Sequence, residues 1–139
     1  MSAGKKPLRV AAYCRVSTDS DDQANSFESQ QRYFRAYIAQ QPHWQLAGIF
    51  ADEGITGTSI EKRDDFKRML RDCERGLIDK ILVKSISRFA RHTTECLETV
   101  RSLKARGVSV YFEKEGIDTG KVSGEMLTAV FASLAQAES

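Results

Sequence analysis

The sequence predicts an α/β fold with a mostly parallel sheet of four to five strands and helices on both faces. Two observations carry this prediction. Short apolar runs alternate along the chain with longer segments whose apolar residues recur at helical spacing. The apolar runs also lack regular polar alternation, which is typical of strands that are buried on both faces.

The apolar runs give four strands in chain order, at residues 8–14, 46–51, 80–83 and 108–112. Residues 15–25 are polar and short-chained, and they are predicted to form a loop. The Gly- and Thr-rich residues 53–63 (EGITGTSIEKR) indicate a mobile loop. Residues 85–92 (SISRFARH) are predicted as a third loop.

Helices connect or follow these strands. The first has a start signal at Asn25 and Glu28, and Pro42 ends it. The second is marked by apolar positions over residues 66–73, and Gly76 terminates it. The other two helices are predicted from an N-cap at Thr93 to a stop at Gly107, and over residues 122–139.

Composition limits the class of protein. Of the 139 residues, 41% are apolar and 29% are charged, which is ordinary for one soluble globular domain. No apolar run approaches the roughly 20 residues that span a bilayer, and residues 1–6 lack the apolar core of a signal peptide. Three widely spaced cysteines predict reduced thiols in a cytosolic protein: Cys14, Cys73 and Cys96. The net charge of +2 is too small by itself to indicate nucleic acid.

The predicted topology brings three loops to one edge of the sheet. Ligands of such folds bind beyond the carboxyl ends of the strands, so we expect the chemistry in residues 15–26, 52–63 and 84–93. The sequence contains no dinucleotide-binding, P-loop or nucleophile-elbow signature. Its two histidines, His43 and His92, are a poor basis for a Ser-His-Asp triad, and this rim lacks a cluster of metal-ligand spacing.

A serine and several arginines do lie on this rim. Alternation along an extended segment would point Tyr13, Arg15 and Ser17 the same way. Arginine binds the non-bridging oxygens of a phosphodiester bidentately and stays protonated, so a serine that faces several guanidiniums suits phosphoryl transfer. Ordinary turn residues and solvated arginines also fit the pattern, and the residues alone leave both interpretations open. The further arginines on the rim are Arg63, Arg88 and Arg91.

Five blocks of the sequence resemble the catalytic domain of serine recombinases, the resolvase/invertase family. The likeness is greatest to the large serine recombinases and to transposon-borne site-specific recombinases. It covers nearly the whole chain in the family's order and implies a resolvase-like, flavodoxin-related architecture. The blocks are YCRVSTD (13–19), SFESQ (26–30), FADEGITGTSIEKR (50–63), ILVKSISRFAR (81–91), and VYFEKEGIDT (110–119) with the closing LAQAES.

The resemblance implies a role for each matching residue. Ser17 would attack a DNA phosphodiester and form a 5′-phosphoserine link, and strand exchange and religation would follow without ATP. Arg15, Arg88 and Arg91 would bind the scissile phosphate, and Arg63 would assist. Asp52 and Gln30 would orient these groups. The supporting residues would be Tyr13, Lys84 and Ser87.

Two positions depart from the family pattern. Ser87 stands where resolvases and invertases have an aspartate, as in the large serine variant, so no acid is expected to be essential there. Asp64 stands where proline is common, and aspartate also favours a helix start. The general base for Ser17 stays open. Arginine, with a pKa above about 12, is a poor base, and Asp52 is a candidate by elimination only.

One segment of the chain is basic. Residues 80–106 contain seven lysines or arginines against two glutamates, Glu95 and Glu98. A DNA backbone could lie against this rim strand and the helix behind it. Solvated helix positions explain Arg101, Lys104 and Arg106 more simply, whereas three cations cluster in one loop: Lys84, Arg88 and Arg91.

The resemblance also implies partners and a setting. We expect double-stranded DNA recombination sites as the substrate, a homodimer and a synaptic homotetramer of the full-length protein, and neither cofactor, metal nor membrane. The family's long subunit-contact helix should begin near Ser139. Residues 1–139 are therefore expected to be an N-terminal catalytic fragment that lacks this helix and the DNA-binding regions, is monomeric or weakly associating, and serves integration or transposition of mobile DNA in the bacterial cytoplasm.

Two other functions stay open at this point. A non-enzymatic phosphate- or nucleotide-binding module on a flavodoxin-like sheet would bind mononucleotides at the rim. A metal-dependent nuclease would cleave DNA in an EDTA-sensitive reaction and would leave no protein attached.

Overall fold

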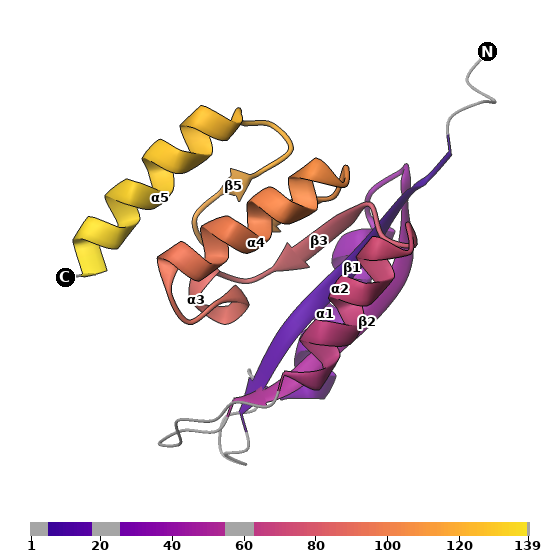
Figure 1. The fold of residues 1–139 in the computed structure, drawn as a ribbon. Coiled ribbons are helices and arrows are strands. Elements are labelled where there is room, and N and C mark those ends of the chain that lie inside the picture. The colour runs from indigo at the N-terminus through magenta and orange to yellow at the C-terminus, as the bar shows by residue number, and fades with distance from the viewer. Residues whose placement is uncertain (1–5, 18–25, 55–62, 139) are drawn as a thin grey trace.

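The fold of the chain is given by a computed structural model that describes residues 6–17, 26–54 and 63–138. Five strands form one sheet in the order β2-β1-β3-β4-β5. This confirms the predicted α/β class, and Figure 1 shows the path of the chain. The elements are β1 (Leu8–Ser17), α1 (Phe27–Ala39), β2 (Trp44–Gly54), α2 (Asp64–Glu74), β3 (Lys80–Val83), α3 (Ile86–Phe89), α4 (Thr93–Ala105), β4 (Ser109–Phe112), β5 (Ile117–Asp118) and α5 (Gly124–Glu138).

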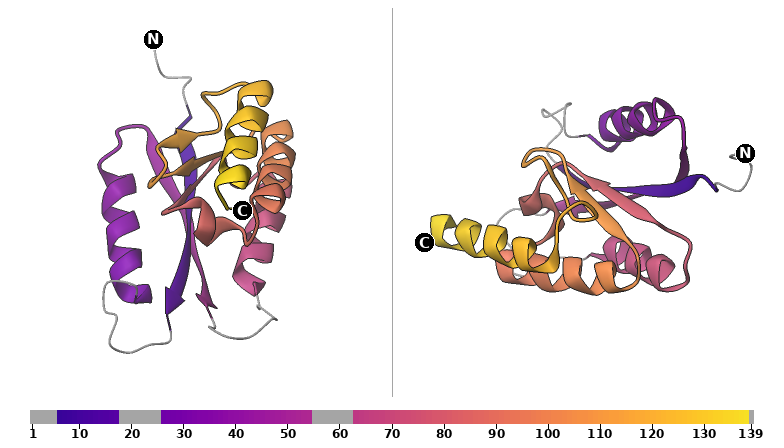
Figure 2. Two further views of the ribbon diagram at one scale, coloured as in Figure 1. Left: turned by 90° about the vertical axis from the view of Figure 1, so that its left-hand side faces the viewer. Right: turned by 90° about the horizontal axis from the view of Figure 1, so that it is seen from above.

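The sheet is parallel except at one edge. The pairs β1–β2, β1–β3 and β3–β4 are parallel, and β5 is antiparallel to β4. Helix α1 covers one face, and α2, α4 and α5 lie on the other (Figure 2). The predicted helices on both faces are therefore confirmed, and β5 supplies a fifth strand of only two residues.

Side chains of β1 divide between two apolar clusters. Ala11 and Tyr13 belong to the larger cluster, which contains residues of α2, α4 and α5. Val10, Ala12 and Cys14 belong to the smaller cluster with residues of α1. This alternation is that of a strand buried on both faces, as the sequence predicted for residues 8–14.

Both N-terminal strands run further than predicted. β1 continues to Ser17 and β2 continues to Gly54, because the two strands pair along their whole length, with Arg15 opposite Asp52. Their polar residues made these ends resemble loops, but ladder pairing overrides side-chain polarity here. Of the predicted loops, residues 18–25 and 55–62 lie outside the described residues.

Two predicted helix starts are wrong by one residue, and two predicted helix stops are confirmed. Ser26 caps α1, since its hydroxyl accepts the N–H of Ser29 at 3.2 Å, so the predicted start at Asn25 is displaced by one residue. His92 rather than Thr93 is the N-cap of α4, and buried Thr93 is its first residue. The stops at Gly76 and Gly107 are confirmed, with φ of +75° and +83° at the left-handed turns that end α2 and α4.

Helix α3 is a single turn inside the segment predicted as a loop. It has four residues, Ile86–Phe89, of which Ile86 and Phe89 are buried. Its two apolar residues give too little periodicity for a sequence signal. This short helix carries Arg88 and leads directly to Arg91.

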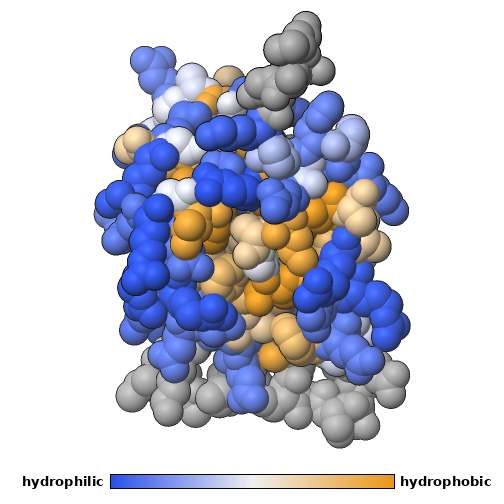
Figure 3. All heavy atoms as spheres, turned by 90° about the vertical axis from the view of Figure 1, so that its right-hand side faces the viewer, coloured by the Kyte–Doolittle hydropathy of each residue, from blue (hydrophilic) through white to orange (hydrophobic). Residues whose placement is uncertain are grey.

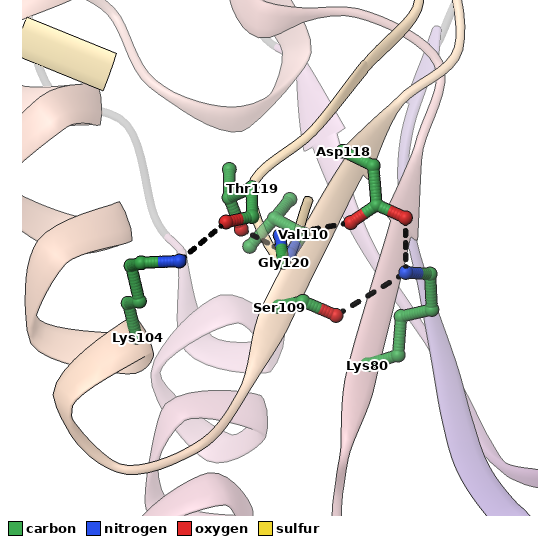
Figure 4. Close-up of polar contacts among 7 residues, drawn as sticks. All are labelled: Lys80, Lys104, Ser109, Val110, Asp118, Thr119 and Gly120. Atoms are coloured by element: carbon green, nitrogen blue, oxygen red, sulfur yellow. Dashed lines mark hydrogen bonds and ion pairs between the residues drawn. The ribbon is translucent and has the colours of Figure 1, made fainter. Parts of the chain in front are cut away.

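Two lysines of the basic segment contact other parts of the fold. The Lys80 ammonium lies 2.7 Å from Asp118 and 3.2 Å from the Ser109 hydroxyl, and the Lys80 residue is only 8% exposed. The Lys104 ammonium donates to the Thr119 carbonyl at 2.7 Å (Figure 4). Both lysines thus tie β3 and α4 to the segment that leads into α5. For Lys104 this corrects the interpretation as a solvated helix position, because its ammonium donates to backbone carbonyls.

The outer edge of the sheet is β2. Partly exposed apolar residues lie along this strand, at Leu46, Ile49 and Ala51. Figure 3 shows the apolar side chains gathered at the centre of this face, between the polar surfaces of the flanking helices.

Arg9 and Asp79 join the start of β1 to the residue before β3. The Asp79 carboxylate accepts the Arg9 backbone N–H at 2.9 Å and its Nε at 3.0 Å. The hydrogen bond from the Arg9 side chain holds the pKa of Asp79 below its ordinary value of 3.8.

We expect this pair to make stability depend on pH at the acid end. Because the folded-state pKa is depressed, the contribution is present above 3.8 and is lost as pH falls below 3.8 through the folded pKa. Asp79→Asn should therefore be less stable than the parent at about pH 6, and the difference should shrink toward about pH 2. Urea unfolding at both pH values measures it, and a difference that stays constant would contradict this origin.

Candidate active site

The candidate site forms where β1 extends past β3. β1 pairs with β3 only over Val10–Tyr13, so beyond Tyr13 it has no strand on that side. The Arg15 carbonyl instead accepts two side-chain donors, Gln30 Nε2 at 3.1 Å and Arg88 Nη1 at 2.8 Å. The structure thereby brings together three of the predicted residues, from β1, α1 and α3.

Positive charge is concentrated around Arg15. Burial lowers the pKa of the Arg15 guanidinium, and the charges of three other arginines lower it further, against an opposing effect of Tyr13. The arginines that act on Arg15 are the predicted ones: Arg63, Arg88 and Arg91. Like charges held this close favour an anionic ligand, because an anion relieves their mutual repulsion.

Asp52 connects Tyr13 to the start of α2. Its carboxylate is 9% exposed and accepts the Tyr13 hydroxyl at 2.8 Å. It also accepts the backbone N–H groups of Asp65 and Phe66, both at 3.0 Å. A carboxylate at these N–H groups caps the helix and offsets its dipole. Burial raises the pKa of the Tyr13 phenol, so Tyr13 is a donor here.

Arg63 connects the start of α2 to α3. Its Nη2 donates to the Phe89 carbonyl at 2.6 Å, and its guanidinium lies 3.7 Å from the centroid of the Phe66 ring. Its Nη1 lies 3.6 Å from the Glu95 carboxylate, and the side chain is 14% exposed. Arg63 is therefore built into the wall of the site, and Phe89 and Glu95 are partners that the sequence reasoning missed.

The two supporting residues proposed near α3 have other contacts. The Lys84 ammonium lies 4.0 Å from the centroid of the Tyr33 ring and 3.7 Å from the Glu113 carboxylate. Ser87 is exposed, and its hydroxyl lies 3.0 Å from that of Ser85. The Lys84 ammonium thus lies near Tyr33 of α1 and near Glu113, the residue that follows β4.

Ser17 is the last residue of β1 and lies opposite Gly54 of β2 in the ladder. It follows Arg15 by two positions in the same strand. Thr18 and Asp19, which complete the first sequence block, lie outside the described residues.

Comparison with known proteins identifies the family. Residues 10–139 match the family model described as "Resolvase, N terminal domain". The Transposon Tn3 resolvase of Escherichia coli is 31% identical over 131 residues, and a resolvase/recombinase of Pseudomonas putida is 29% identical over 132 residues. Each alignment covers 94% of this chain, which spans 64% and 65% of the length of these two relatives.

Solved structures agree with this assignment. A resolvase family site-specific recombinase from Streptococcus pneumoniae is 31% identical, with a TM-score of 0.74 over 94% of this chain and 87% of that one. The N-terminal catalytic domain of TP901-1 integrase is 23% identical, with a TM-score of 0.72 over 94% and 96%, and shows the same fold. In the part of the chain that the structure describes, none of the helices has the length and apolar character to cross a bilayer. The chain belongs to the resolvase N-terminal domain family.

Proposed function

We propose that the chain is the catalytic domain of a serine-type, site-specific DNA recombinase. The observation that carries the proposal is the concentration of guanidiniums at the end of β1, where Arg15 is acted on by the charges of Arg63, Arg88 and Arg91. Ser17 ends the same strand. A phosphodiester placed there meets a serine hydroxyl on one side and fixed positive charge on its non-bridging oxygens.

The reaction conserves the phosphodiester energy. The Ser17 hydroxyl loses its proton as a bond forms between Oγ and phosphorus. The bond from phosphorus to the 3′ oxygen breaks, and the departing 3′ oxygen takes up a proton, so no net proton is released. Religation reverses these events with a 3′-hydroxyl as the attacking group, so no nucleoside triphosphate is consumed. Strand exchange between sites requires several copies, and we propose a dimer and a synaptic tetramer of the complete protein on double-stranded DNA.

The contacts support distinct roles for the polar residues. Arg15, Arg88 and Arg91 bind the phosphate, and a guanidinium with five N–H donors can hold both a carbonyl and a phosphate oxygen. Gln30 shares the Arg15 carbonyl with Arg88 and fixes its position. Three other residues keep α2 and α3 in place around the phosphate. They are Tyr13, Asp52 and Arg63.

Asp52 acts in this proposal as an orienting residue and not as the base for Ser17. Both of its oxygens accept hydrogen bonds, Oδ1 from Asp65 N–H and Oδ2 from Phe66 N–H and the Tyr13 hydroxyl. A proton from Ser17 would have to displace donors that the fold supplies.

Covalent capture tests the proposed reaction. The protein is incubated with end-labelled fragments of random-sequence duplex DNA, with and without EDTA, and the products are separated by denaturing electrophoresis. We expect label attached to protein, unaffected by EDTA, and a tryptic peptide that contains phosphorylated Ser17.

Two outcomes would overturn the proposal in favour of the other functions. Cleavage that EDTA abolishes and that leaves no attached protein indicates a metal-dependent nuclease. Among the described residues, no three His, Cys, Asp or Glu side chains gather as a metal site. Saturable binding of a mononucleotide, with no adduct on any duplex, indicates a nucleotide-binding module.

A further inference from the structure

The two donors on the Arg15 carbonyl come from opposite sides of the sheet. Gln30 belongs to α1, which packs with the smaller apolar cluster, and Arg88 belongs to α3, beside the larger one. Their amide and guanidinium reach one oxygen, at 3.1 and 2.8 Å. For both side chains to reach this oxygen, α1 and α3 must each be held at a defined position along β1.

Helix α3 is held at its N-terminus by a distant carboxylate. Ser85 is the N-cap but provides no side-chain cap hydrogen bond. The Ile86 N–H instead donates to Glu115 Oε1 at 3.2 Å. A helix of four residues has little stability of its own, so the position of Arg88 depends on this contact and on Arg63 at the other end of the turn.

Helix α1 is held by a second carboxylate from the same turn. The Tyr33 hydroxyl donates to Glu113, and the Lys84 ammonium lies 3.7 Å from Glu113 and 4.0 Å from the Tyr33 ring centroid. Tyr33 follows Gln30 by three residues, so the two side chains lie on one face of α1. Glu113 thus fixes the part of α1 from which Gln30 reaches Arg15.

The turn that supplies both carboxylates is itself fixed to the end of β3. The Glu113 N–H donates to the Val83 carbonyl at 3.0 Å, and the Lys114 N–H donates to the Lys84 carbonyl at 2.8 Å. Gly116 closes the turn with φ of +67°, and its N–H donates to the Phe112 carbonyl at 2.8 Å. These backbone hydrogen bonds therefore fix the positions of Glu113 and Glu115 relative to β3.

We propose that the turn Glu113–Gly116 is a positioning element of the active site. Its two carboxylates set α1 and α3 so that Gln30 and Arg88 meet on the Arg15 carbonyl. In this proposal the turn acts through the helices that it holds. The inference rests on the proposed function only in that Arg88 is a phosphate ligand.

Glu115→Ala tests the α3 contact. Without DNA, we expect amide hydrogen exchange in residues 86–91 to become at least about 10-fold faster, because the short helix loses its N-terminal acceptor. With DNA, the single-turnover rate of adduct formation should fall about 10- to 100-fold while DNA affinity changes less than about 3-fold. Glu115→Gln keeps an acceptor and should restore much of the rate. Glu125→Gln, at an exposed glutamate in the first turn of α5, is the matched control.

Tyr33→Phe tests the α1 contact with a minimal change. It removes the hydroxyl that Glu113 accepts and keeps the ring beside Lys84. We expect faster exchange at the start of α1 and a rate of adduct formation reduced about 3- to 10-fold, again with little change in DNA affinity.

The readouts separate this proposal from the proposed function. Exchange rates measured without DNA report on the turn whether or not the parent protein forms adducts. The positioning role is overturned if Glu115→Ala leaves exchange in residues 86–91 at the rate of the Glu125→Gln control. It is also overturned if exchange accelerates but adduct formation in an active parent stays unchanged. Absence of adducts in the parent itself contradicts only the proposed function.

Discussion

Ser17→Ala in the full-length protein is expected to abolish covalent protein–DNA adducts and to leave DNA binding intact. In the proposed reaction the Ser17 hydroxyl becomes bonded to phosphorus, whereas the arginines proposed to bind the phosphate are unchanged. Removal of a nucleophile from a cooperating set of catalytic groups lowers the rate by about 10⁴-fold or more. Denaturing electrophoresis measures the adduct, and fluorescence anisotropy with the same labelled duplex measures binding.

A matched serine variant controls for loss of a hydroxyl. Ser102 is exposed on α4, outside the candidate site, so Ser102→Ala should form adducts at the parental rate. Adducts that persist in Ser17→Ala would refute the assignment of the nucleophile. Loss of DNA binding together with adducts would show that Ser17 acts in binding rather than in chemistry.

Asp52→Ala is expected to cost about 2–4 kcal/mol of the free energy of unfolding. The substitution removes the cap of α2, worth about 1 kcal/mol. It also leaves the buried Tyr13 hydroxyl and the N–H groups of Asp65 and Phe66 without their acceptor, at about 1–3 kcal/mol. Urea unfolding measures the change, and Asp64→Ala, at an exposed residue of the same helix turn, should cost less than about 1 kcal/mol.

Asp52→Asn separates orientation from base catalysis. Asparagine keeps the shape of the side chain and one accepting oxygen, so we expect an intermediate loss of stability and most of the adduct formation in the folded protein. A folded Asp52→Asn protein that forms no adduct would contradict the orienting role and make Asp52 the base for Ser17.

The sheet and its helices were predictable from apolar periodicity, but the strand ends were not. The mostly apolar residues 8–14 predict a strand, whereas the polar residues that follow Cys14 predict a loop from Arg15 onward. The extended conformation of residues 15–17 comes from pairing with β2, a contact between residues far apart in the chain. Local sequence carries little information about such pairing.

Part of the candidate site was likewise predictable from the sequence, and part depends on contacts between distant residues. The sequence blocks pointed to Ser17 and to four arginines, and in the structure the charges of Arg63, Arg88 and Arg91 act on Arg15. The sequence did not predict helix α3, because the helix is one turn long and depends on contacts with distant residues. Glu115 lies 29 residues after Ile86, and Arg63 lies 26 residues before Phe89. Glu113 and Glu115 lie in the sequence block VYFEKEGIDT (110–119), but only their contacts in the structure indicate a role for them.

The brevity of β3 is a requirement of the site. β3 ends at Val83, so the sheet leaves the Arg15 carbonyl without a strand partner, and side chains satisfy it instead. A longer β3 would complete the ladder, strengthen the sheet and occupy that oxygen. Arg88 would then lose the anchor that points it toward Ser17's end of the strand. The sheet thus lacks regular pairing at one position, and a backbone acceptor without a strand partner becomes the reference point for the proposed catalytic groups.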